Sequence, residues 1–312
     1  MKERNKKVLI TGSLVFDTLF DLSNPIRDQI VVKDGVPDKQ NLMFGAHEKR
    51  VYFGGTAGNI AYGTSLLKGK ALVVSVVGQD FSNYAKHLKK PGLEPRLLLD
   101  KNGYTATFYG MSDPNREQIG IFQGNAYHKH VDTLSLDKVL KKSDWKNIGV
   151  GIFAAGTSKS IPKGLKEFKK LAPKDALTIF DPGQMLMIDF TKETIAESLK
   201  HSDILILNDT ELLHLENHFG FTREIIFLAG VKYILETKGA DGSVLHEQNK
   251  KTEVKAVKVK KVVDPTGAGD AYRAGFVHGL LSGKSFEEAM KIGSKLGALC
   301  VETSGGQTYK IS

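Results

Sequence analysis

Short apolar runs rich in β-branched residues alternate with longer amphipathic stretches along most of the chain. Such runs are typical of strands buried on both faces, whereas a stretch such as 161–172 has the spacing of an amphipathic helix. The pattern predicts an α/β fold in which a parallel sheet carries helices on both faces. The predicted strands are 7–13, 71–77, 147–154, 176–181, 203–208 and 232–237.

Two segments interrupt this alternation. Segment 17–52 carries few helix signals, and 103–124 alternates apolar and polar residues as a pair of antiparallel strands does. We expect the two segments to form one small discontinuous β lid. The α/β core is then 1–16, 53–102 and 125–312.

Local sequence signals predict secondary structure in the last 60 residues. Gly283 is expected to end one helix, and Ser285 with Glu288 forms a capping box for the last one. The lysine-rich run 255–261 alternates with apolar residues, which predicts an exposed strand.

Composition bounds the class of protein. The chain has 312 residues, 41% of them hydrophobic, so it can bury a sizeable core. No stretch approaches the roughly 20 apolar residues that span a membrane, and the apolar run after the basic start is too short for a secretory signal. We expect a cytoplasmic protein with no membrane partner. The single cysteine, Cys300, is predicted to be a small core residue.

The formal net charge of +9 raises the question of nucleic acid. The lysines are dispersed along the chain, and no basic stripe is interleaved with aromatic residues. We therefore expect no nucleic-acid partner. A positive field of this size would also attract an anionic nucleotide.

Residues 264–270, with the sequence DPTGAGD, precede an apolar helical run and describe an anion site beside a base. Gly267 and Gly269 allow a tight turn that points N–H groups at one spot, and the following helix adds the positive end of its dipole. Asp270 falls in the first helical turn, where it can accept a proton from an attacking hydroxyl. The alternative is an ordinary glycine-rich turn with Asp270 as a helix-start charge. The combination favours a kinase.

Residues 264–276 resemble the C-terminal signature of the ribokinase-like (PfkB-type) carbohydrate and nucleoside kinases. Segments 53–61, 208–211 and 237–242 resemble further motifs of the same family, in the same order. The resemblance implies a ribokinase-like fold whose small β lid closes over the acceptor. It also implies ATP and Mg²⁺ as cofactors, leaves a monovalent cation such as K⁺ open, and allows a monomer or a lid-mediated homodimer.

The resemblance assigns roles around the transferred group. Asp270 is the expected base, and Arg273 either stabilises transferred charge or faces solvent. The backbone of Gly267, Ala268 and Gly269 is expected to receive the same charge. The expected acceptor-binding residues are Ser13, Asp17, Gly54, Gly55 and Asn59.

On the nucleotide side, Asn208 and Glu211 are expected to hold magnesium through water. A helix cap with Glu211 as its capping-box partner explains the same two residues equally well. Thr237, Gly239 and Gly242 resemble the family's nucleotide loop, although alone they read as a hairpin turn. Gly306, in the GGQ sequence at 305–307, resembles the closing glycine motif beside the donor base.

The acceptor is predicted from the lid. Phe108 and Phe122 are expected to stack on a purine, and Gln184 to read its edge; alternatively the two phenylalanines build only the lid's own core. This set resembles bacterial adenosine kinases, although Met185 stands where those enzymes tend to have a second glutamine. We expect phosphorylation of the 5′-hydroxyl of adenosine to AMP, as in purine salvage. The alternatives are a kinase of ribose or another furanose sugar, and a nucleotide-binding protein without transfer activity.

Overall fold

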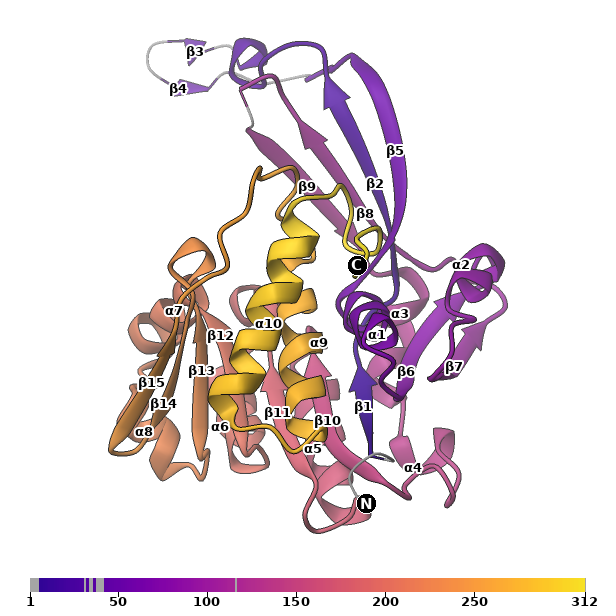
Figure 1. The fold of residues 1–312 in the computed structure, drawn as a ribbon. Coiled ribbons are helices and arrows are strands. Elements are labelled where there is room, and N and C mark those ends of the chain that lie inside the picture. Colours follow the sequence, from indigo (N-terminus) through magenta and orange to yellow (C-terminus); the bar gives the residue numbers. More distant parts are fainter. Residues whose placement is uncertain (1–5, 31, 34–35, 38–41, 116, 312) are drawn as a thin grey trace.

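The computed structural model describes residues 6–30, 32–33, 36–37, 42–115 and 117–311. They form a large sheet covered by helices and a smaller sheet that projects from one end of it (Figure 1). The predicted core and lid ranges also include positions 1–5, 31, 34–35, 38–41, 116 and 312, which lie outside the described residues.

Within the described residues, the large sheet has nine strands in the order β15-β14-β13-β12-β11-β10-β1-β6-β7. The strands from β13 to β7 in this order run parallel, and β14 and β15 form an antiparallel edge. All the strands predicted from apolar runs are confirmed, within two residues at each end. The confirmed strands are β1 (Lys7–Thr11), β6 (Ala71–Gly78), β10 (Ile148–Ala154), β11 (Leu177–Asp181), β12 (Ile204–Asn208) and β13 (Tyr233–Thr237). Strands not predicted are β7 (Leu93–Asp100), β14 (Ser243–Glu247) and β15 (Lys250–Val254).

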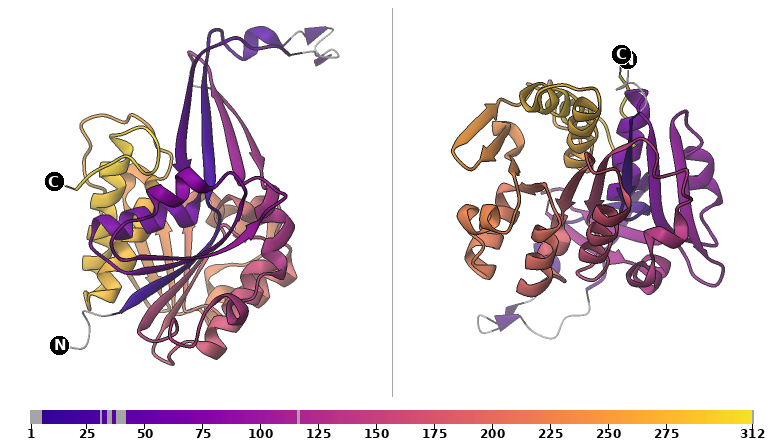
Figure 2. Two further views of the ribbon diagram at one scale, coloured as in Figure 1. Left: turned by 90° about the vertical axis from the view of Figure 1, so that its right-hand side faces the viewer. Right: turned by 90° about the horizontal axis from the view of Figure 1, so that it is seen from below.

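Helices cover both faces of this sheet, as the alternation predicts (Figure 2). Side chains of β1 alternate between the two layers: Val8 and Ile10 belong to one buried cluster and Leu9 to the other. The first layer contains α1 (Thr56–Leu66), α2 (Ser82–His87), α9 (Ala268–Leu281) and α10 (Phe286–Val301). The second contains α3 (Asn125–His130), α4 (Leu136–Val139), α5 (Ser160–Leu171), α6 (Lys192–Lys200), α7 (Asp209–Phe219) and α8 (Arg223–Leu228). Short 3₁₀ turns are η2 (Arg27–Gln29), η3 (Val131–Thr133), η4 (Gly183–Met187) and η5 (Gly239–Asp241).

The small sheet has the strand order β5-β2-β8-β9. Its strands fall in the two predicted lid segments, extending the first by two residues at either end, and β8 and β9 pair antiparallel as expected. These strands are β2 (Val15–Leu22), β5 (Ala46–Gly54), β8 (Ala106–Ser112) and β9 (Gln118–Gln123). Between β2 and β5 lies the short hairpin of β3 (Val32–Lys33) and β4 (Val36–Pro37).

The prediction of an exposed strand at 255–261 is wrong, because this segment has an irregular conformation between β15 and α9. Its backbone bonds to side chains of the C-terminal helix region instead of to another strand. The N–H of Val257 donates to Ser294 Oγ at 3.0 Å, and that of Lys260 donates to Glu302 Oε1 at 2.6 Å. Alternating apolar and polar residues indicate that one side of an extended segment is buried. They do not show whether the segment pairs with a strand or packs beside a helix.

Helices α9 and α10 pack closely because small residues line their contact. A Cβ at Gly275 would lie 2.8 Å from Gly293 Cα, and one at Gly279 would lie 2.6 Å from Ala289 Cα. The expected helix end and capping box are both confirmed: α9 ends at Leu281 just before Gly283, and Ser285 and Glu288 cap α10 reciprocally. Cys300 is buried in this layer, as predicted for a core residue. No helix in the described part of the chain has the length and apolar character needed to cross a membrane.

We predict that Gly275→Ala lowers the free energy of unfolding by about 1–3 kcal/mol, because the added methyl overpacks the contact between α9 and α10. Urea unfolding followed by circular dichroism measures the change. Lys295→Ala, at an exposed position of α10, is the matched control and should stay within about 0.5 kcal/mol of the wild type. Equal stabilities for Gly275→Ala and the wild type would contradict the close packing.

Candidate active site

The glycine-rich turn at 264–270 leads into α9 as the sequence predicts. Gly267 takes a left-handed conformation (φ 79°) and is the N-cap of α9, which places Asp270 in the first turn. Among the described residues, no acceptor bonds to the N–H of Gly269 or Asp270, whereas the N–H of Ala268 is used within the turn by Pro265 O at 3.1 Å. Two free N–H groups and the helix dipole therefore remain for an anion.

Asp270 is held by α1 across the start of α9. Asn59 Nδ2 donates to Asp270 Oδ2 at 2.8 Å, and the other carboxylate oxygen has no hydrogen-bond partner among the described residues. Burial raises the pKa of Asp270 to about 6, because it outweighs the opposing effects of Arg273 and of the bond from Asn59. A carboxylate with one free oxygen and a pKa near neutrality suits a general base.

Arg273 is buried and forms an ion pair with Asp181, at the end of β11. Its Nη2 donates to Asp181 Oδ1 at 2.7 Å, and its Nε contacts the second oxygen. The third guanidinium nitrogen points at the helix start, because a Cβ on Gly269 would lie 2.7 Å from Nη1. The alternative that Arg273 faces solvent is therefore wrong. Its role toward transferred charge stays a prediction.

Sequence reasoning missed Asp181, although a signal was available. The residue ends a buried parallel strand, and polar side chains at that edge of a sheet are the ones that converge on a ligand site. Its Pro-Gly context is typical of a turn, and its partner Arg273 lies 92 residues away. The neighbouring residues therefore do not indicate the Asp181–Arg273 pair.

The acceptor residues predicted at the start of the small sheet lie beside this centre. Asp17 is buried against Gly54, where a Cβ would come within 1.9 Å of Asp17 Oδ2. Gly55 (φ 82°) is the N-cap of α1, and a Cβ there would lie 2.5 Å from Ser13 O. Both glycines are thus required by close approach, and they bring Ser13, Asp17 and the first turn of α1 together.

Asp17 shares the electrostatic environment of the base. Burial raises the pKa of Asp17 to about 7, and the negative charges of Asp270 and Asp264 add to the effect. In the part of the chain that the structure describes, no donor bonds to its carboxylate. The group is thus free to accept from a ligand hydroxyl.

The register of the small sheet places Asp17 in a row with aromatic side chains. Tyr52 of β5 pairs with Asp17 of β2, Asp17 pairs with Phe108 of β8, and Phe108 pairs with Phe122 of β9. Paired residues point to the same face, so the four side chains share one surface of the sheet. An acidic group flanked by rings is the chemistry expected for a sugar hydroxyl beside a flat base.

The two phenylalanines differ in burial. Phe108 packs partly against the buried cluster of Val15 and Ala106, so the core-building alternative holds for it in part. Phe122 is 42% exposed and contacts the edge of His128 at a centroid distance of 5.4 Å. Gln184 is exposed on η4, and no described residue forms a hydrogen bond with it. Among the described residues, no hydrogen bond joins it to the aromatic row.

Asn208 and Glu211 form the capping box that was the alternative to a metal role. Asn208 Oδ1 accepts from the N–H of Glu211 at 2.7 Å, and Glu211 Oε2 accepts from the N–H of Asn208 at 2.9 Å. The described residues contain no group of three or more His, Cys, Asp or Glu side chains arranged to hold a metal ion. One carboxylate oxygen of Glu211 has no described partner, which fits an ion held through its water shell. The magnesium role stays a prediction.

The predicted nucleotide loop is a hairpin connection at the same edge of the sheet. Thr237 pairs with Asn208 across β12 and β13, and the N–H of Lys238 donates to Gly242 O at 2.8 Å. Gly239 (φ 53°) faces open space, with nothing within 4 Å of an added Cβ. The loop thus offers accessible backbone, and its role toward a nucleotide stays a prediction.

Gly306 lies against the centre. A Cβ on it would come within 2.8 Å of Asn59 Nδ2, and a Cβ on Gly267 would lie 2.7 Å from Gly306 Cα. The next residue, Gln307, donates to Asn59 Oδ1 at 3.1 Å and was missed by sequence reasoning. The C-terminal segment is therefore part of the site, and its predicted place beside the donor base is untested.

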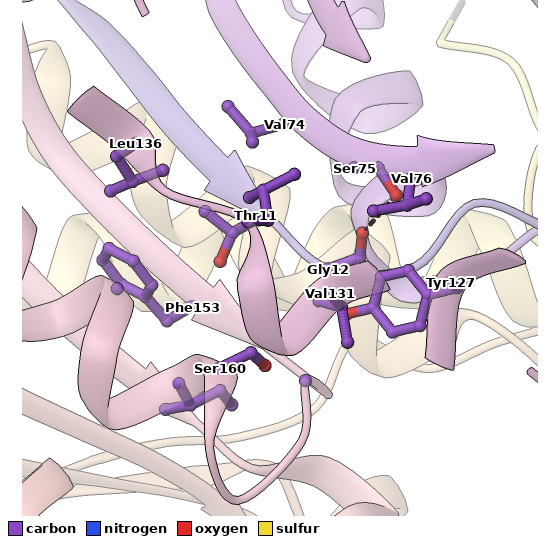
Figure 3. A pocket seen from close by; sticks show the side chains of 14 residues that line it. Thr11, Gly12, Val74, Ser75, Val76, Tyr127, Val131, Leu136, Phe153 and Ser160 are labelled. Carbon is purple, nitrogen blue, oxygen red and sulfur yellow. Dashed lines mark hydrogen bonds between the residues drawn. The ribbon is translucent and has the colours of Figure 1, made fainter. Parts of the chain in front are cut away.

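The small pocket in Figure 3 is a different feature. It lies between the ends of β1, β6 and β10 under α3 and α5, and its volume is about 30 Å³. Ser75 Oγ donates to Gly12 O at its edge, and no predicted site residue lines it. It has room for little more than a water molecule, whereas small-molecule sites measure about 300–1,000 Å³.

Two curated proteins with similar sequences are nucleoside kinases. A nucleoside kinase from Methanocaldococcus jannaschii is 32% identical over 262 residues, covering 83% of this chain and 82% of that protein. A nucleoside kinase from Methanothermobacter thermautotrophicus is 27% identical over 284 residues, covering 90% and 88%.

Solved structures give the same result. The nucleoside kinase of M. jannaschii superposes with a TM-score of 0.84 at 28% identity, covering 98% of this chain and 94% of that one. The nucleoside kinase of Burkholderia thailandensis in complex with inosine has a TM-score of 0.80 at 28% identity, covering 97% and 93%. A profile of the family described as pfkB family carbohydrate kinase matches residues 19–311. This chain therefore belongs to the pfkB family of carbohydrate kinases and has its ribokinase-like fold.

Proposed function

We propose that this phosphotransferase moves the γ-phosphoryl group of ATP to the 5′-hydroxyl of adenosine, giving AMP and ADP. The observation that carries the proposal is the Asn59–Asp270 hydrogen bond at the start of α9. It leaves one oxygen of Asp270 free beside the unpaired N–H groups of the first helical turn. A base and an anion site are thereby adjacent, as transfer requires.

In the proposed reaction, Asp270 takes the proton of the 5′-hydroxyl as that oxygen bonds to the γ-phosphorus. The bond to the β-phosphate oxygen breaks, and ADP leaves with its electron pair. The N–H groups of Gly269 and Asp270 and the Nη1 of Arg273 meet the charge on the transferring group. Magnesium, when bound with the nucleotide, neutralises part of the polyphosphate charge. Asn208, Glu211 and the Thr237–Gly242 loop form the donor side.

On the acceptor side, Asp17 and Asn59 hold the ribose hydroxyls, and the free carboxylate of Asp17 can accept from them. Phe108 and Phe122 supply the surface on which the purine stacks. The small sheet acts as a lid that excludes water before transfer. The inosine complex of the B. thailandensis relative supports a purine nucleoside over a bare sugar. The family resemblance leaves a monovalent cation such as K⁺ open and allows either a monomer or a lid-mediated homodimer.

We predict that Asp270→Asn lowers kcat by about 10²–10⁴-fold, since the amide cannot accept the hydroxyl proton. Release of ADP with adenosine measures kcat, and calorimetry measures nucleotide affinity, which should change little. Glu287→Gln removes one exposed negative charge of α10 and serves as the matched control with wild-type activity. Turnover in Asp270→Asn at the wild-type rate would refute the assignment of the base.

The pH dependence of kcat/KM should follow the two raised carboxyl pKa values. Base catalysis needs ionised Asp270, and ionised Asp17 accepts from ribose hydroxyls more strongly than its protonated form does. Because their pKa values are about 6 and about 7, kcat/KM should fall as the pH drops through 7 and 6, with a limiting slope approaching two. If kcat/KM stays constant down to about pH 5, as ordinary aspartates with pKa values near 4 would give, the two raised pKa values do not control the reaction.

A panel of acceptors tests the substrate. Phe122→Ala should raise the KM for adenosine by about 3–10-fold, because the purine loses a stacking partner. The KM for ribose, which has no base to stack, should not change. Ile121→Ala changes the neighbouring exposed residue on the opposite face of β9 and should leave both unchanged. ADP release with ribose or fructose but not with adenosine or inosine would establish the sugar kinase instead. Release with none of them would favour a binding protein without transfer activity.

A further inference from the structure

A buried polar chain runs from the C-terminal segment to the proposed base. Gln307 Nε2 donates to Tyr84 Oη at 2.6 Å and to Asn59 Oδ1 at 3.1 Å. Tyr84 Oη donates in turn to Gly54 O at 2.6 Å, and Asn59 Nδ2 donates to Asp270 Oδ2. These residues come from α1, α2, α9 and the C-terminal segment, which meet only in the folded protein.

The hydrogens of this chain are used consistently. The two hydrogens of the Gln307 amide serve its two shortest bonds, to Tyr84 and to Asn59, with Gly54 O farther away at 3.5 Å. The single hydroxyl hydrogen of Tyr84 goes to Gly54 O. Asn59 therefore has its oxygen fixed toward Gln307 and its NH₂ group fixed toward Asp270. A reversed Asn59 amide would place its oxygen against an ionised carboxylate, so the charged base and the Gln307 donor select the same orientation.

The surrounding structure enforces this arrangement. Gln307 is 5% exposed and Tyr84 is fully buried, so water cannot replace a lost partner freely. Gly58 leaves room for these hydrogen-bonded side chains, since a Cβ there would lie 1.9 Å from Tyr84 Oη. The N–H of Gly305 donates to Asp264 Oδ2 at 2.9 Å, which fastens the C-terminal segment to the glycine-rich turn.

We propose that Gln307, supported by Tyr84, is a positioning residue that fixes the amide orientation of Asn59 and so leaves one oxygen of Asp270 free for the acceptor hydroxyl. The inference rests on the proposed function of Asp270 as the base. It assigns a catalytic consequence to the end of the chain, which touches neither substrate in that proposal.

The decisive variant is Gln307→Glu, which keeps the size of the side chain and replaces the donor by an acceptor. In its ionised form the new carboxylate attracts the NH₂ group of Asn59, which turns the Asn59 oxygen toward Asp270. The bond from Asn59 lowers the pKa of Asp270, so its loss should raise that pKa. We expect kcat to fall about 10–100-fold, the acid limb of the pH profile to move up by about one pH unit, and the KM for ATP to stay within about twofold.

Two further variants separate positioning from stability. Gln307→Met removes the donor without adding a charge and should change kcat and the acid limb in the same direction by a smaller amount. Tyr62→Phe removes the bond from Tyr62 Oη to Tyr309 O, which anchors the same segment without touching Asn59. It should lower thermal stability and leave the pH profile unchanged. Equal effects of Tyr62→Phe and Gln307→Met on the acid limb would reduce Gln307 to a structural residue and overturn the proposal.

Failure of the proposed function gives a different result. If the wild type releases no ADP with any acceptor, the kinase proposal fails, and the positioning proposal is judged by titrating ¹³C-labelled aspartate carboxyls by NMR. The Asp270 signal, identified by its absence in Asp270→Asn, should titrate at higher pH in Gln307→Glu and Gln307→Met than in the wild type. An unchanged titration, or an active wild type matched by both variants in kcat and pH profile, overturns the role of Gln307.

Discussion

The candidate site depends on how buried negative charge is balanced at the carboxyl edge of the large sheet. Arg273 pairs with Asp181, and its positive charge also reaches Asp270 and Glu211. An unpaired charge in this environment would be costly, whereas a pair with well-placed hydrogen bonds is tolerated. Because burial still outweighs this compensation, the pKa of Asp270 and that of Glu211 stay above their ordinary values. The same burial that makes the edge difficult to build is what makes its carboxylates basic.

The guanidinium geometry explains how one residue serves both structure and chemistry. Its Nε and Nη2 face Asp181, and Nη1 faces the start of α9 at Gly269. A lysine has no such fork, because its three donors share one nitrogen and could not bond to both oxygens of Asp181 while a separate nitrogen faces Gly269. The absence of a side chain at Gly269 is part of the arrangement, since a Cβ there would lie only 2.7 Å from Nη1.

The sequence predicted those parts of the fold whose causes are local. Apolar runs located the parallel strands, alternation located the small sheet, and Ser285 with Glu288 marked the start of α10. Local patterns were ambiguous where one pattern has two physical causes. The alternation at 255–261 came from packing beside α10, and the Asn208–Glu211 spacing suits a cap as well as an ion.

The missed residues have partners that are remote in sequence. The partners of Asp181 and Gln307 lie 92 and 248 positions away in the sequence. The residues that flank Asp181 and Gln307 do not indicate these pairings. The row formed by Asp17 with Phe108 and Phe122 depends on strand register, which pairs β2 with β8 across an insertion of the core. Motif resemblance placed Asp270, Asn59 and Asp17 together because it carries information about the folded family, which composition and periodicity lack.

The C-terminal segment that carries Gln307 also constrains how the protein is made. During translation, α1 and the strands around β1 leave the ribosome long before residue 307 is joined to the chain. Until then Asn59 and Tyr84 can bond to Asp270 and Gly54 but lack Gln307, so the partly synthesised chain can form much of its sheet before the hydrogen bonds of the candidate site are complete. The candidate site is therefore completed only after residue 307 has been synthesised.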